Sequence, residues 1–321
     1  MQNSHASFTA GVVGNGQLLG VVRRTHPRSR PALRTLYTFL CLSIVSLSAA
    51  AGADQPTLVD RLSGSRVCAH RGGYSFPDSN TIERFAKAAR QGADIVETDL
   101  QLSADGVPFL FHDTKLDPAT ICRGPVSAFP ADAIDHCRLH GLSHGPERFE
   151  SALQWSRGRI VIDAEFKSPE VIRPAIDLVR RYSAYEWVYF QVGYRMDMYR
   201  EARAYDPRVA LEAAPRGPSA QLTLDRLLQL RDPRLVSVQL HPDLATSSNI
   251  EAIRRSGKLV AADGFRFGTE YRWVIWPFRR VAFCSDLYRR GIGVVVTNVP
   301  ASCAEQRDAA RAQAAELTLA P

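Results

Sequence analysis

Short apolar runs alternate with amphipathic stretches along the chain from residue 66 onward. Runs of four to eight apolar residues bounded by turn residues are typical of buried strands. Strands are therefore predicted at 66–69, 95–100, 107–111, 160–165, 188–191, 209–212, 235–239, 259–262 and 294–297. Helical periodicity occupies most of the intervals, as at 171–182, 196–205, 223–230 and 249–255. Strands that alternate with helices in this way predict a parallel sheet.

The interval between the first two predicted strands carries signals for the start and the end of a helix. Asn80 is a natural N-cap, and Glu83, three residues later, is placed to complete a capping box. The apolar positions Ile82, Phe85, Ala86 and Ala89 fall on one face of a helix. Gly92 supplies a C-terminal stop. We therefore expect a helix that begins next to Asn80 and packs one face on the sheet.

Chain length and strand number together favour a closed barrel. About eight strands over some 250 residues fit a (β/α)8 TIM barrel better than an open sheet. The 321 residues have room for one such barrel, 54–321, after an N-terminal tail. Residues 113–150 are rich in Pro, Gly, His and Cys and are predicted to form a small insertion after the second strand. A second long excursion, rich in Trp, Phe and Arg, covers 264–285.

The basic net charge says little about the barrel itself. The chain has 40 Lys and Arg against 33 Asp and Glu, a net charge of +7. Residues 1–53 hold five arginines and no acidic residue, which leaves 35 basic and 33 acidic residues, or +2, for the rest. No later basic run is interleaved with aromatic residues, and this argues against nucleic acid as a partner. Nothing in the sequence implies a protein partner either.

Residues 1–53 have the pattern of a signal peptide with a basic N-terminal tail. An arginine-rich flank precedes an uncharged apolar run of twelve residues, 36–47, and small residues follow at 49–53. The run is short for a membrane span, which needs about 20 residues. The pattern predicts export to the periplasm or the exterior, with cleavage after Ala51 or Ala53. An uncleaved membrane anchor is the alternative.

Five cysteines remain when the one inside the apolar run of the tail is set aside. Export would make disulfides possible. Cys122 and Cys137 flank a short loop-rich segment and are the better candidate pair, with Cys284 and Cys303 second. Cys68 lies within an apolar run and is predicted to be a free buried thiol.

Three acidic residues at predicted strand ends indicate a metal site. Glu97 and Asp99 are two positions apart, so their side chains point to the same side of a strand. Glu165 lies near the carboxyl end of the third barrel strand, and barrel active sites lie at these ends. Three inward carboxylates are costly to bury without a cation, and oxygen ligands suit Mg²⁺ or Ca²⁺. A single Glu-x-Asp pair is more often a solvated strand edge, so the prediction of one divalent cation rests on the joint pattern.

Basic residues and histidines follow the same strands. His70 and Arg71 end the first strand, His112 follows the strand at 107–111, and Lys167 comes two residues after Glu165. Arg71 and Lys167 are suited to hold a phosphate anion. His70 and His112 beside a metal and a phosphate suggest a general acid–base pair. The pattern therefore indicates chemistry on a phosphate ester.

Taken in order, these motifs resemble the glycerophosphodiester phosphodiesterase family, in its bacterial, secreted form. They are His70-Arg-Gly72, Asn80-Thr81, Gly92-Ala-Asp94, Glu97-Thr-Asp99, Ser103-Ala-Asp-Gly106, His112-Asp113 and Glu165-Phe-Lys167, with a last match at 291–297. The resemblance implies a (β/α)8 barrel with an insertion after the second strand. It also implies hydrolysis of glycerophosphodiesters to glycerol phosphate and an alcohol with a divalent cation. A neighbouring hydroxyl of the substrate would attack phosphorus.

Carried over by position, the resemblance gives each candidate residue a role. Glu97, Asp99 and Glu165 would bind the metal. His70 and His112 would be the acid–base pair, with the order of their roles left open. Arg71 and Lys167 would hold the substrate phosphate.

The departures from the family pattern concern the substrate pocket. They are Asp78-Ser-Asn-Thr81 for Pro-Glu-Asn-Thr, Gln191-Val192 for Ser-Phe, Ala261-Ala-Asp-Gly264 for Trp-Thr-Val-Asn, and Thr297-Asn-Val-Pro300 for Thr-Asp-x-Pro. Glu212 is expected to be structural. One alternative function is hydrolysis of lysophospholipids or another lipid-linked phosphodiester, with peripheral membrane contact through Trp273, Trp276, Phe278 and Phe283. For these aromatic residues, packing at the bottom of the barrel or over its last strand is favoured over lipid contact. A non-catalytic binding barrel is a further alternative, disfavoured because no metal or histidine residue is lost.

Overall fold

The computed structural model describes residues 56–73, 79–264 and 283–319. The predicted signal peptide and its cleavage site lie outside these residues, and so does Asp78. Of the four aromatic residues considered for lipid contact, Trp273, Trp276 and Phe278 also lie outside the described part. Phe283 is described and is buried, so it offers no surface to a lipid.

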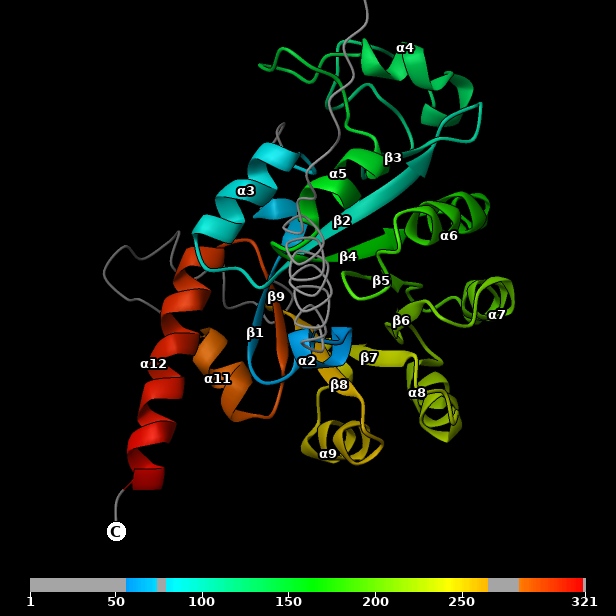
Figure 1. Cartoon of the computed structure of the whole chain (residues 1–321). Helices are drawn as coiled ribbons and strands as arrows, with labels where there is room; N and C mark the ends of the chain where they lie inside the picture. Colours follow the sequence, from blue (N-terminus) through cyan, green and yellow to red (C-terminus); the bar gives the residue numbers. More distant parts are fainter. Residues whose placement is uncertain (1–55, 74–78, 265–282, 320–321) are drawn as a thin grey trace, which may run out of the picture. The chain divides into compact units, whose positions relative to one another are not determined.

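Eight parallel strands close into a barrel (Figure 1). In ring order they are β1 (Arg66–Ala69), β2 (Ile95–Leu102), β4 (Val161–Phe166), β5 (Val188–Gln191), β6 (Ala210–Ala213), β7 (Leu235–Leu240), β8 (Leu259–Asp263) and β9 (Val294–Thr297). The ring closes because β1 pairs with both β2 and β9. β3 (Pro108–Leu110) pairs antiparallel with β2, outside the ring. The predicted (β/α)8 barrel is confirmed.

Helices follow most of the strands and cover the outside of the barrel. Those that lie between consecutive barrel strands are α3 (Ile82–Arg90), α5 (Phe149–Ser156), α6 (Ile172–Arg181), α7 (Met196–Tyr205), α8 (Ala220–Gln229), α9 (Ser247–Arg255) and α11 (Phe283–Arg289). In Figure 1, α6 to α9 lie outward of the strands that precede them. The chain continues after β9 as α12 (Pro300–Leu319). Among the residues with a described placement, no helix is both long and apolar enough to cross a bilayer.

The inside of the barrel changes from apolar to polar along its axis. Leu58 and Leu62, the first and last residues of α2 (Leu58–Leu62), are buried among interior side chains such as Ile95 and Val161, which begin their strands. Side chains two positions apart on a strand face the same way, so Glu97 follows Ile95 into the interior. The amino-terminal end is thus filled with apolar side chains, and the carboxyl-terminal end is left for polar ones.

Helix α3 begins one residue later than predicted. Thr81 is the N-cap, and its hydroxyl accepts a hydrogen bond from the backbone N–H of Arg84 at 3.3 Å. Arg84 therefore occupies the third helical position, and the predicted capping box of Asn80 with Glu83 is wrong. Asn80 instead adopts a φ of 61° and is buried, which frees its side chain to turn toward the barrel.

The insertion after the second barrel strand forms a small core of its own. It contains the short helices η2 (Val126–Ala128) and α4 (Ala131–Asp135), and its buried side chains include Phe111, Leu116 and Ile134. The predicted disulfide Cys122–Cys137 ties this segment. The second predicted disulfide, Cys284–Cys303, links α11 to α12, and Cys68 is a free buried thiol as expected.

Candidate active site

A cavity of about 160 Å³ opens at the carboxyl ends of the barrel strands. All of the predicted site residues line it except Asp99, which is almost completely buried beside it. A larger hollow of about 520 Å³ lies at the other end, beside residues that begin strands, such as Leu235 and Leu259. In barrel enzymes the carboxyl ends carry the chemistry, and the predicted residues gather there rather than at the larger hollow.

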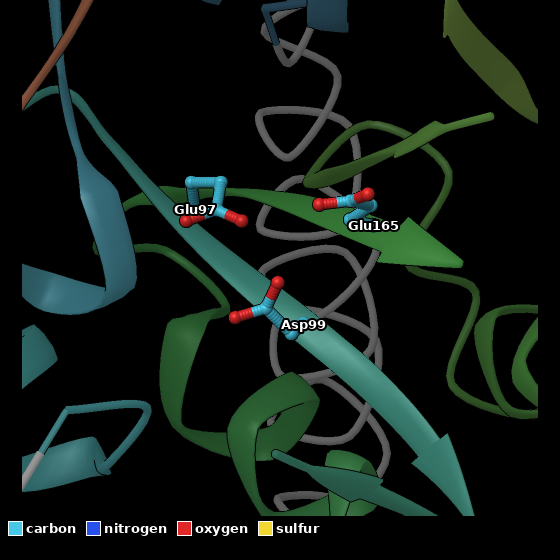
Figure 2. A group of neighbouring side chains, drawn as sticks. All are labelled: Glu97, Asp99 and Glu165. Atoms are coloured by element: carbon cyan, nitrogen blue, oxygen red, sulfur yellow. The ribbon is translucent and has the colours of Figure 1, made fainter. Parts of the chain in front are cut away.

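Three carboxylates form a compact cluster beside this cavity (Figure 2). Glu97 and Asp99 come from β2, and the register of the sheet places Asp99 next to Glu165 of β4. Carboxylate oxygens of the three residues lie within 4.8 Å of one another. Burial, together with the charges of Asp99 and Glu165, raises the pKa of Glu97 well above its usual range. A hard divalent cation would offset the repulsion among these buried carboxylates, so the donor set fits the predicted metal ion.

Two cationic side chains balance part of this charge. The Lys167 ammonium lies 2.7 Å from Asp99 Oδ1 and 2.8 Å from Glu165 Oε2. The Arg71 Nε lies 3.1 Å from Asp99 Oδ2. Burial opposes ionisation of Asp99, but Lys167 and Arg71 outweigh it and hold the pKa of this carboxyl well below its usual range. Asp99 is therefore ionised at neutral pH and available as a ligand.

The turn after β1 places both Arg71 and its backbone amide at the cluster. Arg71 has a φ of 53°, and its N–H donates to Glu97 Oε2 at 2.9 Å. Gly72 follows with a φ of 80°, and a Cβ at that position would lie 2.9 Å from side-chain atoms of Arg84 and Phe85. The glycine is therefore required for the chain to bring two donors of one residue to two carboxylates.

Asn80 is a site residue that the sequence reasoning assigned only to a helix cap. Its amide nitrogen donates to Asp99 Oδ2 at 2.9 Å. Its amide oxygen accepts from the Thr98 hydroxyl at 2.8 Å and from the Asp99 backbone N–H at 3.3 Å. These bonds fix the orientation of the amide and aim Asp99 into the cluster. The Asn80-Thr81 pair carries a sequence signal, but the same signal fits a helix cap.

The two histidines face the cavity from different elements. His70 Nδ1 lies 2.8 Å from Asn298 Oδ1, and its Nε2 lies 4.0 Å from Glu97 Oε2. Burial lowers the pKa of His70, so its neutral form is favoured. His112 Nδ1 lies 2.7 Å from Asp113 Oδ1, and its side chain is 40 % exposed. Because an oxygen acceptor faces each Nδ1, each ring can present Nε2 to a substrate.

The far wall of the cavity is polar. Gln191 and Asp263 belong to the departures that concern the substrate pocket, whereas Gln239 and Arg216 are not among the predicted site residues. Gln191, Gln239, Asp263 and Arg216 line it, and the first three are nearly fully buried. The amide nitrogen of Gln191 donates to Gln239 at 2.8 Å and to Glu212 at 3.0 Å, and Gln239 donates to Asp263. Glu212, which accepts the hydrogen bond from Gln191, is fully buried, and its structural role stays a prediction.

The comparisons with known proteins agree with this geometry. Residues 70–168 match the model of the Glycerophosphoryl diester phosphodiesterase family. The "Probable glycerophosphodiester phosphodiesterase 2" of Mycobacterium tuberculosis is 28% identical over 170 residues, 52% of this chain and 64% of that protein. The bovine "Glycerophosphodiester phosphodiesterase 1" is 44% identical over 61 residues, 19% of this chain and 18% of that protein. The chain thus spans about a fifth of such mammalian relatives.

Solved structures share the fold. A glycerophosphodiester phosphodiesterase from Agrobacterium tumefaciens superposes with a TM-score of 0.61 at 21% identity, covering 76% of this chain and 99% of that one. A phosphodiesterase from Oleispira antarctica, solved in complex with the product sn-glycerol-3-phosphate, gives a TM-score of 0.60 at 19% identity, covering 76% and 97%. At this level of identity the likeness shows the barrel, and the chemistry rests on the residues of this chain.

Proposed function

We propose that this chain, whose residues 70–168 belong to the glycerophosphodiester phosphodiesterase family, hydrolyses glycerophosphodiesters to glycerol phosphate and an alcohol. One observation carries the proposal. Two histidines, two arginines and one lysine line the same small cavity as two of three clustered carboxylates. The side chains that could bind a phosphodiester and transfer protons to and from it therefore lie around one cavity.

The carboxylate cluster is the proposed site of one divalent cation, Ca²⁺ or Mg²⁺. Glu97, Asp99 and Glu165 would hold it, and when bound it would neutralise the non-bridging phosphoryl oxygens. Lys167 and Arg71 contact Asp99 of the same cluster and would also bind the substrate phosphate. Asn80 supports the arrangement by orienting Asp99.

The histidines would move the protons. A hydroxyl of the glycerol next to the phosphate attacks phosphorus, one histidine removes its proton, and the other donates a proton to the leaving alkoxide. The products of this step are a cyclic glycerol phosphate and the free alcohol. Water then opens the ring with the two histidine roles reversed, which regenerates both protonation states. The neutral form favoured by burial suits His70 as the first base, and His112, whose Nδ1 lies beside Asp113, would be the first acid.

The experiment that tests this function is product identification. The purified chain with Ca²⁺ or Mg²⁺ is incubated with glycerophosphoglycerol, and the products are followed by phosphorus NMR. We expect loss of the diester signal and growth of a glycerol phosphate signal. A folded protein that leaves a panel of glycerophosphodiesters intact would contradict the proposal.

Export is proposed as well. Two disulfides support it, because such bonds persist mainly in oxidising compartments. Expression of the full chain followed by N-terminal sequencing of the exported form should give a start just after Ala51 or Ala53. Retention of the whole protein inside the cell would contradict this proposal.

A further inference from the structure

Arg216 lies between the catalytic cavity and a second hollow. It belongs to the loop that connects β6 to α8 (Figure 1). This loop and the one after β7 border a groove of about 480 Å³. Arg216, His241 and Asp243 are among the residues that line the groove. Arg216 is the residue that the groove and the cavity share.

The cavity alone is small for a whole substrate. Its volume of about 160 Å³ is below the roughly 300–1,000 Å³ of typical ligand sites. A glycerophosphodiester bound with its phosphate at Arg71 and Lys167 must therefore extend beyond the cavity. The groove that adjoins it through Arg216 has room for the remaining part of the molecule.

The guanidinium of Arg216 is the least tightly paired of the three cations that line the cavity. Its closest carboxylate oxygen, on Asp263, is 3.9 Å away, and its hydrogen bond to Gln239 Oε1 is 3.4 Å long. Lys167 and Arg71, by contrast, have carboxylate oxygens at 2.7 Å and 3.1 Å. A guanidinium carries five N–H donors, so Arg216 has several to offer to a ligand.

The groove has the wrong chemistry for a cationic head group. Among the described residues that line it there is no Trp, Tyr or Phe, the side chains whose faces attract a quaternary ammonium. The carboxylate of Asp243 is 88% exposed and lies 3.2 Å from His241. Arg216 adds a positive charge at the entrance. Hydroxyl oxygens, which accept hydrogen bonds from a guanidinium, suit this lining better.

We propose that Arg216 is a specificity-determining residue that binds the leaving-alcohol part of the substrate. The preferred substrates are glycerophosphodiesters with a polyol head group, and those with a quaternary ammonium are disfavoured. This inference rests on the proposed function, because it assumes that the phosphate lies at Arg71 and Lys167. It assigns the groove to the head group and the cavity to the phosphate.

The test measures binding without turnover. The variant His112→Ala, loaded with Ca²⁺, is titrated calorimetrically with glycerophosphoglycerol, glycerophosphocholine and inorganic phosphate. We expect the polyol diester to bind about tenfold tighter than the choline diester, as one charge-assisted hydrogen bond would give. Adding Arg216→Gln should remove this preference and leave the affinity for inorganic phosphate unchanged. Adding Arg195→Gln, an exposed arginine that pairs with Asp197 away from both hollows, should change none of the three affinities.

Three outcomes would overturn the inference. The choline diester could bind as tightly as the polyol diester, or the polyol diester could show no binding at millimolar concentration. Alternatively, Arg216→Gln could weaken all three ligands equally, which would show that Arg216 only supports Gln239 and Asp263. Turnover by the unmodified chain is measured separately. Loss of the proposed function with retained binding preference would therefore be distinguishable from failure of this inference.

Discussion

The two halves of the active-site wall are both polar and buried, but they differ in the kind of polarity. The half formed by β1, β2 and β4 carries full charges at close range, with Lys167 within 2.8 Å of two carboxylates. The half formed by β5, β7 and β8 carries mainly amides, with Gln191 bonded to Gln239 and Gln239 to Asp263. Charged groups can hold a metal and a phosphate, whereas amides recognise neutral hydroxyls. In the proposed function, the charged half would hold the cation and the phosphate, and the amide half would face uncharged hydroxyl groups of the substrate.

The charged half also contains its own supports. Asn80 and the Arg71 backbone amide each hold one carboxylate in place. The amide half depends on a chain of mutual hydrogen bonds that ends in the buried Glu212. Disturbing the charged half should therefore affect catalysis, and disturbing the amide half should affect substrate choice and stability.

The largest effect is expected from Glu97→Gln. Loss of one carboxylate from the cluster should remove cation binding and lower kcat/KM by about 10³-fold or more. Turnover and calcium titration on the same preparation measure both properties. Glu83→Gln on α3 serves as the matched control and should behave as the unmodified chain. A Glu97→Gln variant that still responds to added cation would place the metal elsewhere.

His112→Ala should lower turnover by about 10²- to 10⁴-fold, because general acid–base catalysis is lost. Binding of the cation should persist, since His112 contacts Asp113 rather than the carboxylate cluster. The matched control is His140→Ala, an exposed histidine of the insertion. Full activity in His112→Ala would remove this histidine from the mechanism.

A smaller effect is expected at Asn80. Asn80→Ala removes one of the partners that orient Asp99, and loss of such a partner typically costs about 10- to 100-fold in metal affinity or activity. The neighbouring Thr81→Ala removes the helix cap instead and should cost about 1 kcal/mol of stability. Steady-state kinetics and urea unfolding on the two variants measure the contrast. Equal effects of both on kcat/KM would mean that Asn80 is only part of the helix start.

The smallest effect on activity is expected from Glu212→Gln, which should instead change how stability depends on pH. Burial raises the pKa of Glu212 to about 7, so the folded state holds a proton that the unfolded state releases above about 4.5. Stability of the native chain should then fall as pH rises from about 5 to 7, by at most 1.4 kcal/mol per unit of pH from this group. Urea unfolding at several pH values should show a flatter profile for the variant. Identical profiles would contradict the shifted pKa.

The fold could be predicted from sequence because most barrel strands are short and largely apolar and lie between turn residues, as at 188–191 and 294–297. The charged half of the site could be predicted for a related reason. Glu97, Asp99, Glu165 and Lys167 each lie on a strand or just after its end, so alternation alone gives their direction.

The amide half could be predicted only in part: Gln191 and Asp263 stand at departures from the family pattern, but no local motif assigns them or Gln239 a role. Gln191 and Gln239 end or nearly end strands on the opposite side of the ring, and only closure of the barrel brings them to one cavity. Asn80 was misassigned because Asn is a common helix cap, and the left-handed backbone that turns it toward Asp99 has no local signature. The hydrophobic pattern of a sequence therefore does not predict which distant strands meet at the cavity. It also does not predict an unusual backbone conformation such as that of Asn80.

The central claim is that one cation at the carboxylate cluster is required for phosphodiester hydrolysis. The direct measurement is the rate of glycerol phosphate release from glycerophosphoglycerol by the purified chain. The rate is recorded first with EDTA and then with excess Ca²⁺ or Mg²⁺, with Glu97→Gln in parallel. We expect the unmodified chain to lose activity with the chelator and to regain it with the cation, while Glu97→Gln stays inactive throughout. Undiminished turnover in the chelated enzyme would contradict the central claim.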